Sequence, residues 1–270
     1  MNVVSAMLLS ALIARPVQES SDTKEALKKG LETSAAAGGY TFTGTVEQDS
    51  PLGGAALAIG ASMLASGPDG KCTGTRGADG VSHLRIEKEK NSYEFFRKGS
   101  KVVHRQMWKG TAISPGDFAS EANAALDLER LAKFASKAKD LKSETKKIDD
   151  VECLVVSASL PADFVEEEAT EGGPAFAFKM FELKKIDVKF TFGKSDNLLR
   201  KAEFKFVKGF NAMIQGAMPG GDEEGGDEGG EEGANMAKAS FTSAFKITLG
   251  AFSKTAAVTV PEDVKGLLTE

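Results

Sequence analysis

The sequence predicts an α+β protein in which a curved antiparallel sheet, an open half-barrel, carries helices over its concave face. Four runs in the second half of the chain alternate apolar and polar residues with period two, as a strand does when one face is buried and the other solvated. They are residues 185–193, 198–207, 241–249 and 256–260. Two helical segments are interspersed with strands in meander order, and a sheet curled around these helices accommodates both features.

The first part of the chain supplies one helix and five strands. Residues 20–23 offer helix N-cap side chains, and a helix over 24–36 ends at the glycine pair 38–39. A strand over 40–48 follows, and tight turns separate four more strands at 71–76, 81–88, 92–98 and 101–108. Residues 51–70 are rich in Gly and Ala. We expect a loop insertion there, with a short helix over the sheet as the alternative.

The middle of the chain predicts a second helix over 117–141. Its apolar stripe consists of Leu126, Leu128, Leu131, Phe134 and Ala135. Strands at 143–148 and 151–159 follow, and a short helix over 264–268 comes last. No repeat period is evident, which disfavours a propeller or a solenoid.

Residues 1–20 are expected to be an export signal or another apolar segment. Residues 1–14 are almost wholly apolar, a length that suits the hydrophobic part of a signal peptide and is too short for a membrane-spanning helix. No Lys or Arg precedes this run, and Leu12-Ile13-Ala14 is a poor cleavage motif. A buried N-terminal helix or a misplaced start codon is the alternative. Export predicts a periplasmic or secreted protein of the bacterial envelope.

The negative charge is concentrated in one tract. The chain has a net charge of −5, yet seven of its acids lie in the Gly-rich residues 216–233, and without them 32 Asp and Glu stand against 34 Lys and Arg. We expect this tract to be a disordered acidic loop, because it cannot bury enough apolar area to offset the entropy of ordering. A weak Ca²⁺ site is the alternative. The lysines elsewhere are spread along strand faces, so no nucleic-acid partner is predicted.

The chain has too few cysteines and histidines to predict a metal site. The two cysteines, Cys72 and Cys153, lie in expected strands. In an exported protein such a pair suggests a disulfide, and two buried free thiols are the alternative. The only histidines are His83 and His104, and no metal site is predicted from them.

The sequence also predicts a protein without catalytic residues. His83, Arg85 and Glu87 share one face of the strand over 81–88, which favours a solvated face over an acid–base or metal site. No nucleophile elbow, Gly-rich phosphate loop or dinucleotide fingerprint is present. We therefore expect a non-enzymatic protein that needs no cofactor.

Four segments of the chain carry a family resemblance: YTFTGTVEQD at 40–49, YEFFRKGSKVVHRQMWKG at 93–110, DVECLVVSASLP at 150–161 and FTSAFKITLGAFSKTAAVTVPEDVKGLL at 241–268. In their pattern they resemble the LolA/LppX superfamily of periplasmic lipoprotein and lipid carriers. The resemblance is one of pattern and order over 22–268. It implies a single domain over 21–270, an open half-barrel with helices plugging an apolar cavity, and binding of acyl chains or lipoproteins without chemistry. The insertions at 51–70 and 216–233 depart from it.

The resemblance directs attention to residues that would line such a cavity. We expect these to be Phe42, Phe95, Trp108, Leu128, Leu131 and Phe134, with ordinary core packing as the alternative for each. The expected function is binding of an acyl chain, lipid or lipoprotein, with an envelope protein as a further partner. The alternative is a structural or interaction protein with a filled core.

Overall fold

The computed structural model describes residues 21–49, 70–88, 91–99, 101–106, 118–165, 181–210 and 240–268, which include ten strands. The strands are β1 (Gly39–Asp49), β2 (Gly70–Arg76), β3 (Ser82–Lys88), β4 (Asn91–Lys98), β5 (Lys101–Gln106), β6 (Lys139–Ile148), β7 (Val151–Leu160), β8 (Phe181–Gly193), β9 (Leu199–Phe210) and β10 (Ser240–Ser253).

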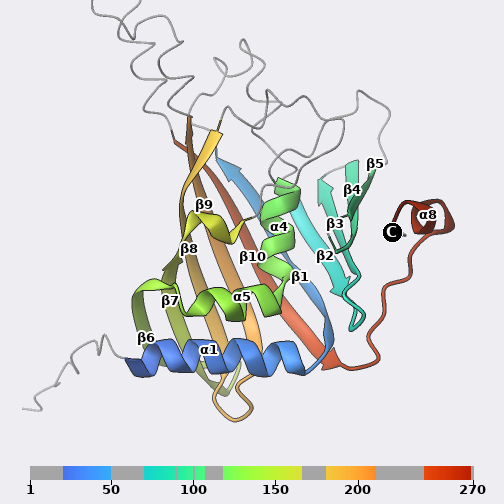
Figure 1. Ribbon diagram of the computed structural model, residues 1–270. Coiled ribbons are helices and arrows are strands. Elements are labelled where there is room, and N and C mark those ends of the chain that lie inside the picture. Colours follow the sequence, from blue (N-terminus) through green and yellow to red (C-terminus); the bar gives the residue numbers. More distant parts are fainter. Residues whose placement is uncertain are drawn as a thin grey trace, which may run out of the picture.

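All ten strands belong to one antiparallel sheet in the order β5-β4-β3-β2-β1-β10-β9-β8-β7-β6. The first and last strands, β1 and β10, pair at its centre, and a meander runs outward from each of them. Because β5 and β6 lie at opposite ends of this order, the described sheet is open. The predicted fold class, a curved antiparallel sheet with helices, is confirmed (Figure 1).

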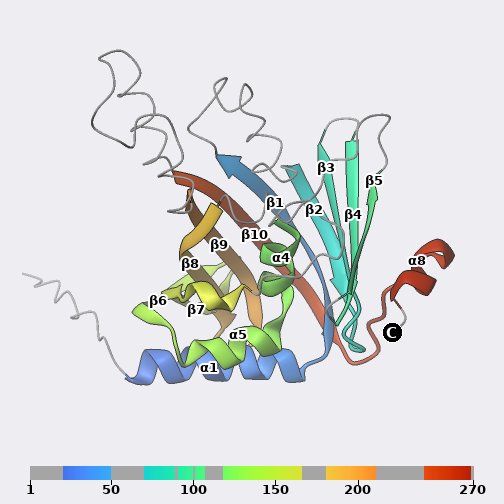
Figure 2. The ribbon, with the colours of Figure 1, turned by 45° about the horizontal axis from the view of Figure 1, so that its top comes forward.

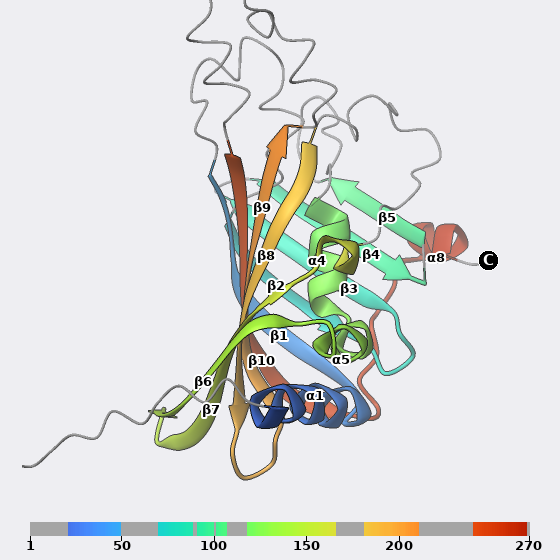
Figure 3. The ribbon, with the colours of Figure 1, turned by 60° about the vertical axis from the view of Figure 1, so that its left-hand side comes forward.

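Helices cover the concave face of this sheet. They are α1 (Ser21–Ala36), α4 (Phe118–Leu126) and α5 (Leu128–Ala135). α1 and α5 lie across one end of the face, and α4 rises from them along the sheet (Figure 2). Figure 3 shows the three helices on one side of the sheet, with the β2–β5 wing curving around them. No helix among the described residues is long and apolar enough to cross a membrane.

The strand alternation expected from the sequence decides which side chains form the core. On β8, Ile186, Val188, Phe190 and Phe192 point inward and are at most 3% exposed. The intervening Lys185, Asp187 and Lys189 lie on the outer face. The inward residues of β9 and β10 join them, and Phe190 packs edge-on against Phe204 with 5.7 Å between ring centroids. The apolar core therefore lies between the sheet and the helices.

The single helix expected over 117–141 is two helices. Asp127 adopts an extended backbone conformation (φ −93°, ψ 91°), and its Oδ1 accepts a hydrogen bond from the Arg130 amide at 3.0 Å. This side chain caps the N-terminus of α5 and separates it from α4. The chain then leaves the helix after Ala135, and β6 begins at Lys139, within the range expected to be helical.

The strand expected over 256–260 is absent from the described sheet, because these residues link β10 to α8 (Glu262–Leu268). Val258 and Val260 are half-buried against a small cluster of Phe96, Val264 and Leu268. Their alternation thus reflects contacts with α8 rather than pairing with a strand. The same cluster buries Phe96 on the opposite face from Phe95, which belongs to the main core.

Several sequence expectations concern residues outside the described ranges. These are the export segment 1–20, the insertion at 51–70 except for Gly70, the acidic loop 216–233 and Trp108. Of the two alternatives for the cysteines, the structure has free thiols: Cys72 lies in β2 and Cys153 in β7, both buried. Four strands separate β2 from β7 in the sheet order, which is far more than a disulfide spans.

Candidate binding site

The concave face presents a continuous apolar surface on the β7–β10 side of the sheet. Phe245 of β10 lies opposite Phe204 of β9, which lies opposite Val188 of β8. The Phe204 ring stacks on that of Phe206, with centroids 6.0 Å apart. These side chains are at most 3% exposed. Apolar rows that run across several strands form a surface along which a hydrocarbon chain could lie.

The other wing extends this surface around the helices. Phe42 lies opposite Gly74, Gly74 opposite Leu84, and Leu84 opposite Phe95 on four successive strands. The Phe42 ring occupies the space that a side chain at Gly74 would need, since a Cβ there would lie 2.3 Å from Phe42 Cζ. Glycine at this position therefore lets the aromatic row close without a gap.

α5 is firmly attached to the end of the sheet. Leu128 and Leu131 are buried in the main core, while Phe134 is half-buried and packs edge-on against Phe164 at 5.5 Å. Phe164 belongs to the 3₁₀ turn η1 (Ala162–Phe164) after β7. Arg130 of α5 lies over both rings and donates hydrogen bonds to the carbonyls of Phe164 and Asp163. These contacts hold α5 to η1.

α4 is attached differently, through small side chains and polar contacts. Its buried apolar residues whose side chains are described are Ala122, Ala124, Ala125 and Leu126. At its C-terminal end the Leu126 carbonyl accepts a hydrogen bond of 2.6 Å from the Tyr40 hydroxyl of β1. Burial raises the pKa of Tyr40 above its ordinary value, so the hydroxyl remains a neutral donor at physiological pH.

Near its other end, α4 makes a buried ion pair with the sheet. Glu121 Oε1 lies 2.7 Å from Lys208 Nζ of β9, and Glu121 Oε2 accepts a hydrogen bond of 2.7 Å from Ser243 Oγ of β10. Glu121 is 2% exposed, Lys208 7% and Ser243 1%. We call these three residues the polar triad. A buried charge pair is costly to desolvate, so its presence in an apolar surface marks an unusual position.

Sequence reasoning missed the polar triad, although two signals pointed to it. Lys208 follows Ala202, Phe204 and Phe206 at the next inward position of β9, and Ser243 is the polar interruption in the inward series of β10. A polar residue at a position that periodicity assigns to the core is a candidate for a buried interaction. Their partner Glu121 lies on another element, so neither signal identifies it.

Five of the six residues expected to line a cavity are described. Phe42, Phe95, Leu128 and Leu131 come together in one core and are at most 6% exposed. Phe134 lies at the margin of that core and Trp108 outside the described residues. Phe42 and Phe95 belong to the sheet and Leu128 and Leu131 to α5, so all four lie between the sheet and its helices, and any ligand reaching them must displace a covering element.

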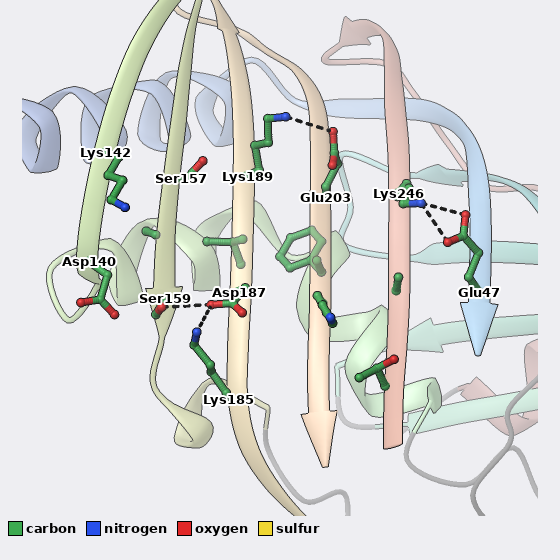
Figure 4. A pocket seen from close by; sticks show the side chains of 16 residues that line it. Glu47, Asp140, Lys142, Ser157, Ser159, Lys185, Asp187, Lys189, Glu203 and Lys246 are labelled. Carbon is green, nitrogen blue, oxygen red and sulfur yellow. Dashed lines mark hydrogen bonds and ion pairs between the residues drawn. The ribbon is translucent and has the colours of Figure 1, made fainter. Parts of the chain in front are cut away.

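A large hollow lies on the opposite, outer face of the sheet (Figure 4). It has a volume of about 1120 Å³ and extends over β6 to β10 and β1. Its charged side chains are largely paired: Lys246 lies 2.8 Å from Glu47, Lys185 lies 2.9 Å from Asp187, and Lys189 lies 3.9 Å from Glu203. Such a lining favours water over hydrocarbon, so the concave face is the better candidate for an apolar ligand.

The sequence predicted that the charged face of β3 would be solvated. In the structure this face is partly covered. His83 stacks on Phe96 with 4.5 Å between ring centroids, and its Nε2 lies 3.5 Å from Glu94 Oε1. Burial is the main cause that lowers the pKa of His83, while Glu94 opposes the change. Arg85 pairs with Glu87 at 2.7 Å. Within the described ranges, no group of three or more His, Cys, Asp or Glu side chains converges as a metal site.

Two solved structures resemble this chain distantly. No family model matches the chain, and no curated protein matches its sequence. Among solved structures, LprF from Mycobacterium bovis is 13% identical with a TM-score of 0.42, covering 88% of this chain and 96% of LprF. The LolA superfamily protein NE2245 from Nitrosomonas europaea is 10% identical with a TM-score of 0.29, again over 88% and 96% of the two chains.

Likenesses this distant assign no function to the chain. The fold is judged instead from the strand order and the helices of the chain itself. An open antiparallel sheet with helices over its concave face is the arrangement that the resemblance to the LolA/LppX superfamily implied. At the level of fold, the expected open, curved antiparallel sheet with helices over its concave face is confirmed.

Proposed function

We propose that this chain is a non-catalytic binding protein that takes up an acyl chain on the concave face of its sheet after α4 moves aside. One observation carries the proposal: the Phe-rich surface of β9 and β10 is covered by an Ala-rich helix whose described polar contacts with the sheet include the polar triad and a tyrosine hydrogen bond. Among its described side chains this helix buries three alanines and one leucine, so these give up little large apolar surface when the helix leaves the sheet.

The free energies of this exchange favour a long hydrocarbon chain. Removing apolar surface from water contributes about 25 cal/mol per Å², or roughly 0.8 kcal/mol for each buried CH₂ group. Separating Glu121 from Lys208 loses an ion pair, and Glu121 regains its hydration as α4 moves into solvent while Lys208 stays with the sheet. Ala side chains bury less area than Leu or Phe, so an acyl chain can replace their contacts with the sheet.

The ligand class follows from this exchange, and the cellular setting from the sequence. An acyl chain belongs to a free lipid or to a lipoprotein, and an envelope protein would supply or receive it. The apolar residues 1–14 support export to the periplasm or the medium. Mass spectrometry of the N-terminus of the chain purified from its host tests export: a cleaved segment supports it, and an intact Met1 in the cytoplasmic fraction overturns it.

Lipid binding is tested by native mass spectrometry of the full chain with 1-monopalmitoylglycerol, a neutral single-chain lipid. The proposal predicts a complex with one bound lipid, and hydrogen exchange that speeds up in α4 while α1 stays protected. An outer-face variant, Ala244→Trp, is the matched control, because it narrows the polar hollow and should leave binding unchanged. Loss of binding in this control would place the ligand on the wrong face for the proposal.

A second candidate function is favoured by the filled core. Because Phe42, Phe95, Leu128 and Leu131 are all buried in the described core, the chain could serve as a structural or interaction protein. That candidate predicts no lipid complex and no change in the exchange of α4. A chain that stays lipid-free in the native mass experiment would support it, and its partner would then be sought by pull-down.

A further inference from the structure

We infer that the ligand of the concave face carries a carboxylate head group, which Lys208 and Ser243 bind in place of Glu121. The inference rests on the proposed function and adds the chemical class of the ligand: a long-chain fatty acid anion in preference to a neutral lipid. The polar triad is the feature that carries it.

In the structure, the Glu121 carboxylate occupies a ready-made carboxylate site. One oxygen lies 2.7 Å from the Lys208 ammonium and the other accepts the Ser243 hydroxyl at 2.7 Å. Both donors belong to the adjacent sheet strands β9 and β10, whereas the carboxylate belongs to α4. When α4 leaves, the donors stay with the sheet and the carboxylate departs. The site then lacks the anion that it held.

The surroundings of the two donors suit the chain of a fatty acid. Lys208 lies opposite Phe241 on one neighbouring strand and opposite Leu183 on the other. Ser243 lies opposite Phe206, whose ring stacks on that of Phe204. A carboxylate held at the donors would therefore place the start of its hydrocarbon chain on the apolar rows of the concave face.

Charge explains why an anion should be preferred there. A buried ammonium is strongly disfavoured when it loses its countercharge. A ligand carboxylate supplies Lys208 with the negative countercharge that is lost when Glu121 departs, whereas the hydroxyls of a neutral lipid do not. Glu121 also competes with the ligand, because its carboxylate binds the same two donors whenever α4 is in place.

Competition binding of palmitate and 1-monopalmitoylglycerol to the full chain tests the inference. We expect the wild type to bind palmitate at least about tenfold more tightly, the scale of one charge-assisted contact. Glu121→Gln removes the internal competitor and should strengthen palmitate binding by a further factor of about ten, with a much smaller change for the neutral lipid. Glu121→Gln/Lys208→Met should bind both lipids equally.

The double variant guards against misfolding, because it removes both buried charges together instead of stranding one. Glu47→Gln/Lys246→Met makes the corresponding change in an ion pair of the outer face and should retain the wild-type preference. Equal binding of both lipids by the wild type, or an equal effect of Glu121→Gln on both, overturns the head-group inference and leaves the proposed function standing. If no folded variant binds either lipid, the proposed function itself is overturned.

Discussion

Single residues of α1 show how closely the helices are fitted to the sheet. A Cβ on Gly30 would lie 2.6 Å from the Phe192 ring of β8, and Ser34 Oγ accepts a hydrogen bond of 2.8 Å from the Leu199 amide of β9. The same hydroxyl donates to the Gly30 carbonyl at 2.7 Å. These contacts place α1 at a fixed position on the core.

Replacing this glycine should destabilise the protein even though the helix gains a better helix former. Alanine favours an exposed helix by about 1 kcal/mol over glycine. Here its methyl group meets the inner ring atoms of Phe192, and overpacking of this kind costs typically 1–3 kcal/mol. We expect Gly30→Ala to lower the free energy of unfolding in urea. A gain in stability would show that the α1–β8 contact is looser than described.

The two thiols should be unreactive in the native protein and reactive once it unfolds. Burial raises the pKa of the Cys72 thiol to about 12, which leaves very little thiolate at pH 8. Cys153 is also buried. We expect Ellman's reagent to label neither cysteine in the folded chain, and both in guanidinium without reductant. Labelling that requires reductant would instead demonstrate a disulfide.

His83 should make the protein less stable in mild acid. The folded state holds its pKa below the ordinary value of 6.5, chiefly through burial, so the unfolded chain binds more protons as the pH falls below about 6.5. Stability from neutral His83 is therefore present above that pH and is lost on acidification. Urea unfolding of wild type and His83→Gln between pH 7 and 5 should show a smaller loss in the variant. Parallel curves would contradict this assignment.

At the scale of elements, the three covering helices differ in how they can move. α1 is fitted to Phe192 and Leu199, and α5 is held to η1 by Arg130. The described polar contacts of α4 with the sheet include the polar triad near one end and the Tyr40 hydrogen bond at the other. If any covering helix opens to admit a ligand, these contacts identify α4 as the one that does so at the lowest cost.

Loosening the Tyr40 end of α4 should therefore promote binding. Tyr40→Phe removes the hydrogen bond to the Leu126 carbonyl, an interaction worth about 1 kcal/mol, and so raises the fraction of molecules with α4 displaced. We expect the dissociation constant of 1-monopalmitoylglycerol to fall by about three- to tenfold. Tyr93→Phe on β4 is the matched control, because it deletes the other tyrosine hydroxyl of the chain. Unchanged or weaker binding by Tyr40→Phe would argue against α4 as the cover.

At the scale of the whole molecule, the period-two alternation predicts the sheet well, because the apolar residues within each strand mark the face that is buried. The inward residues Val188, Phe204 and Phe245 were recognisable from sequence alone for this reason. Helix boundaries that depend on one side chain could not be recognised from the sequence. Asp127 caps α5 and so ends α4, although the apolar stripe continues across this position. Val258 and Val260 alternate like a strand, yet they pack on the cluster formed with α8.

The candidate site was only partly predictable, because its polar part joins distant segments. Glu121 lies 122 residues before Ser243 in the chain, and only the folded sheet brings them together. Four of the six apolar residues expected from the family resemblance gather in one core, but periodicity cannot separate a ligand-binding face from ordinary packing. That distinction depends on whether a covering helix can leave the concave face. The contacts between the helix and the sheet decide this, and they join segments that are distant in the sequence.

The most direct measurement is photo-crosslinking of the full chain with a palmitoyl lipid that carries a diazirine along its acyl chain. Inward and outward residues alternate on β9 and β10, so the labelled positions report the face. Binding on the concave face predicts label on Phe204, Phe206 and Phe245 and none on Lys205 or Ala244 between them. Label confined to Lys205 and Ala244, or no specific label, would contradict the account.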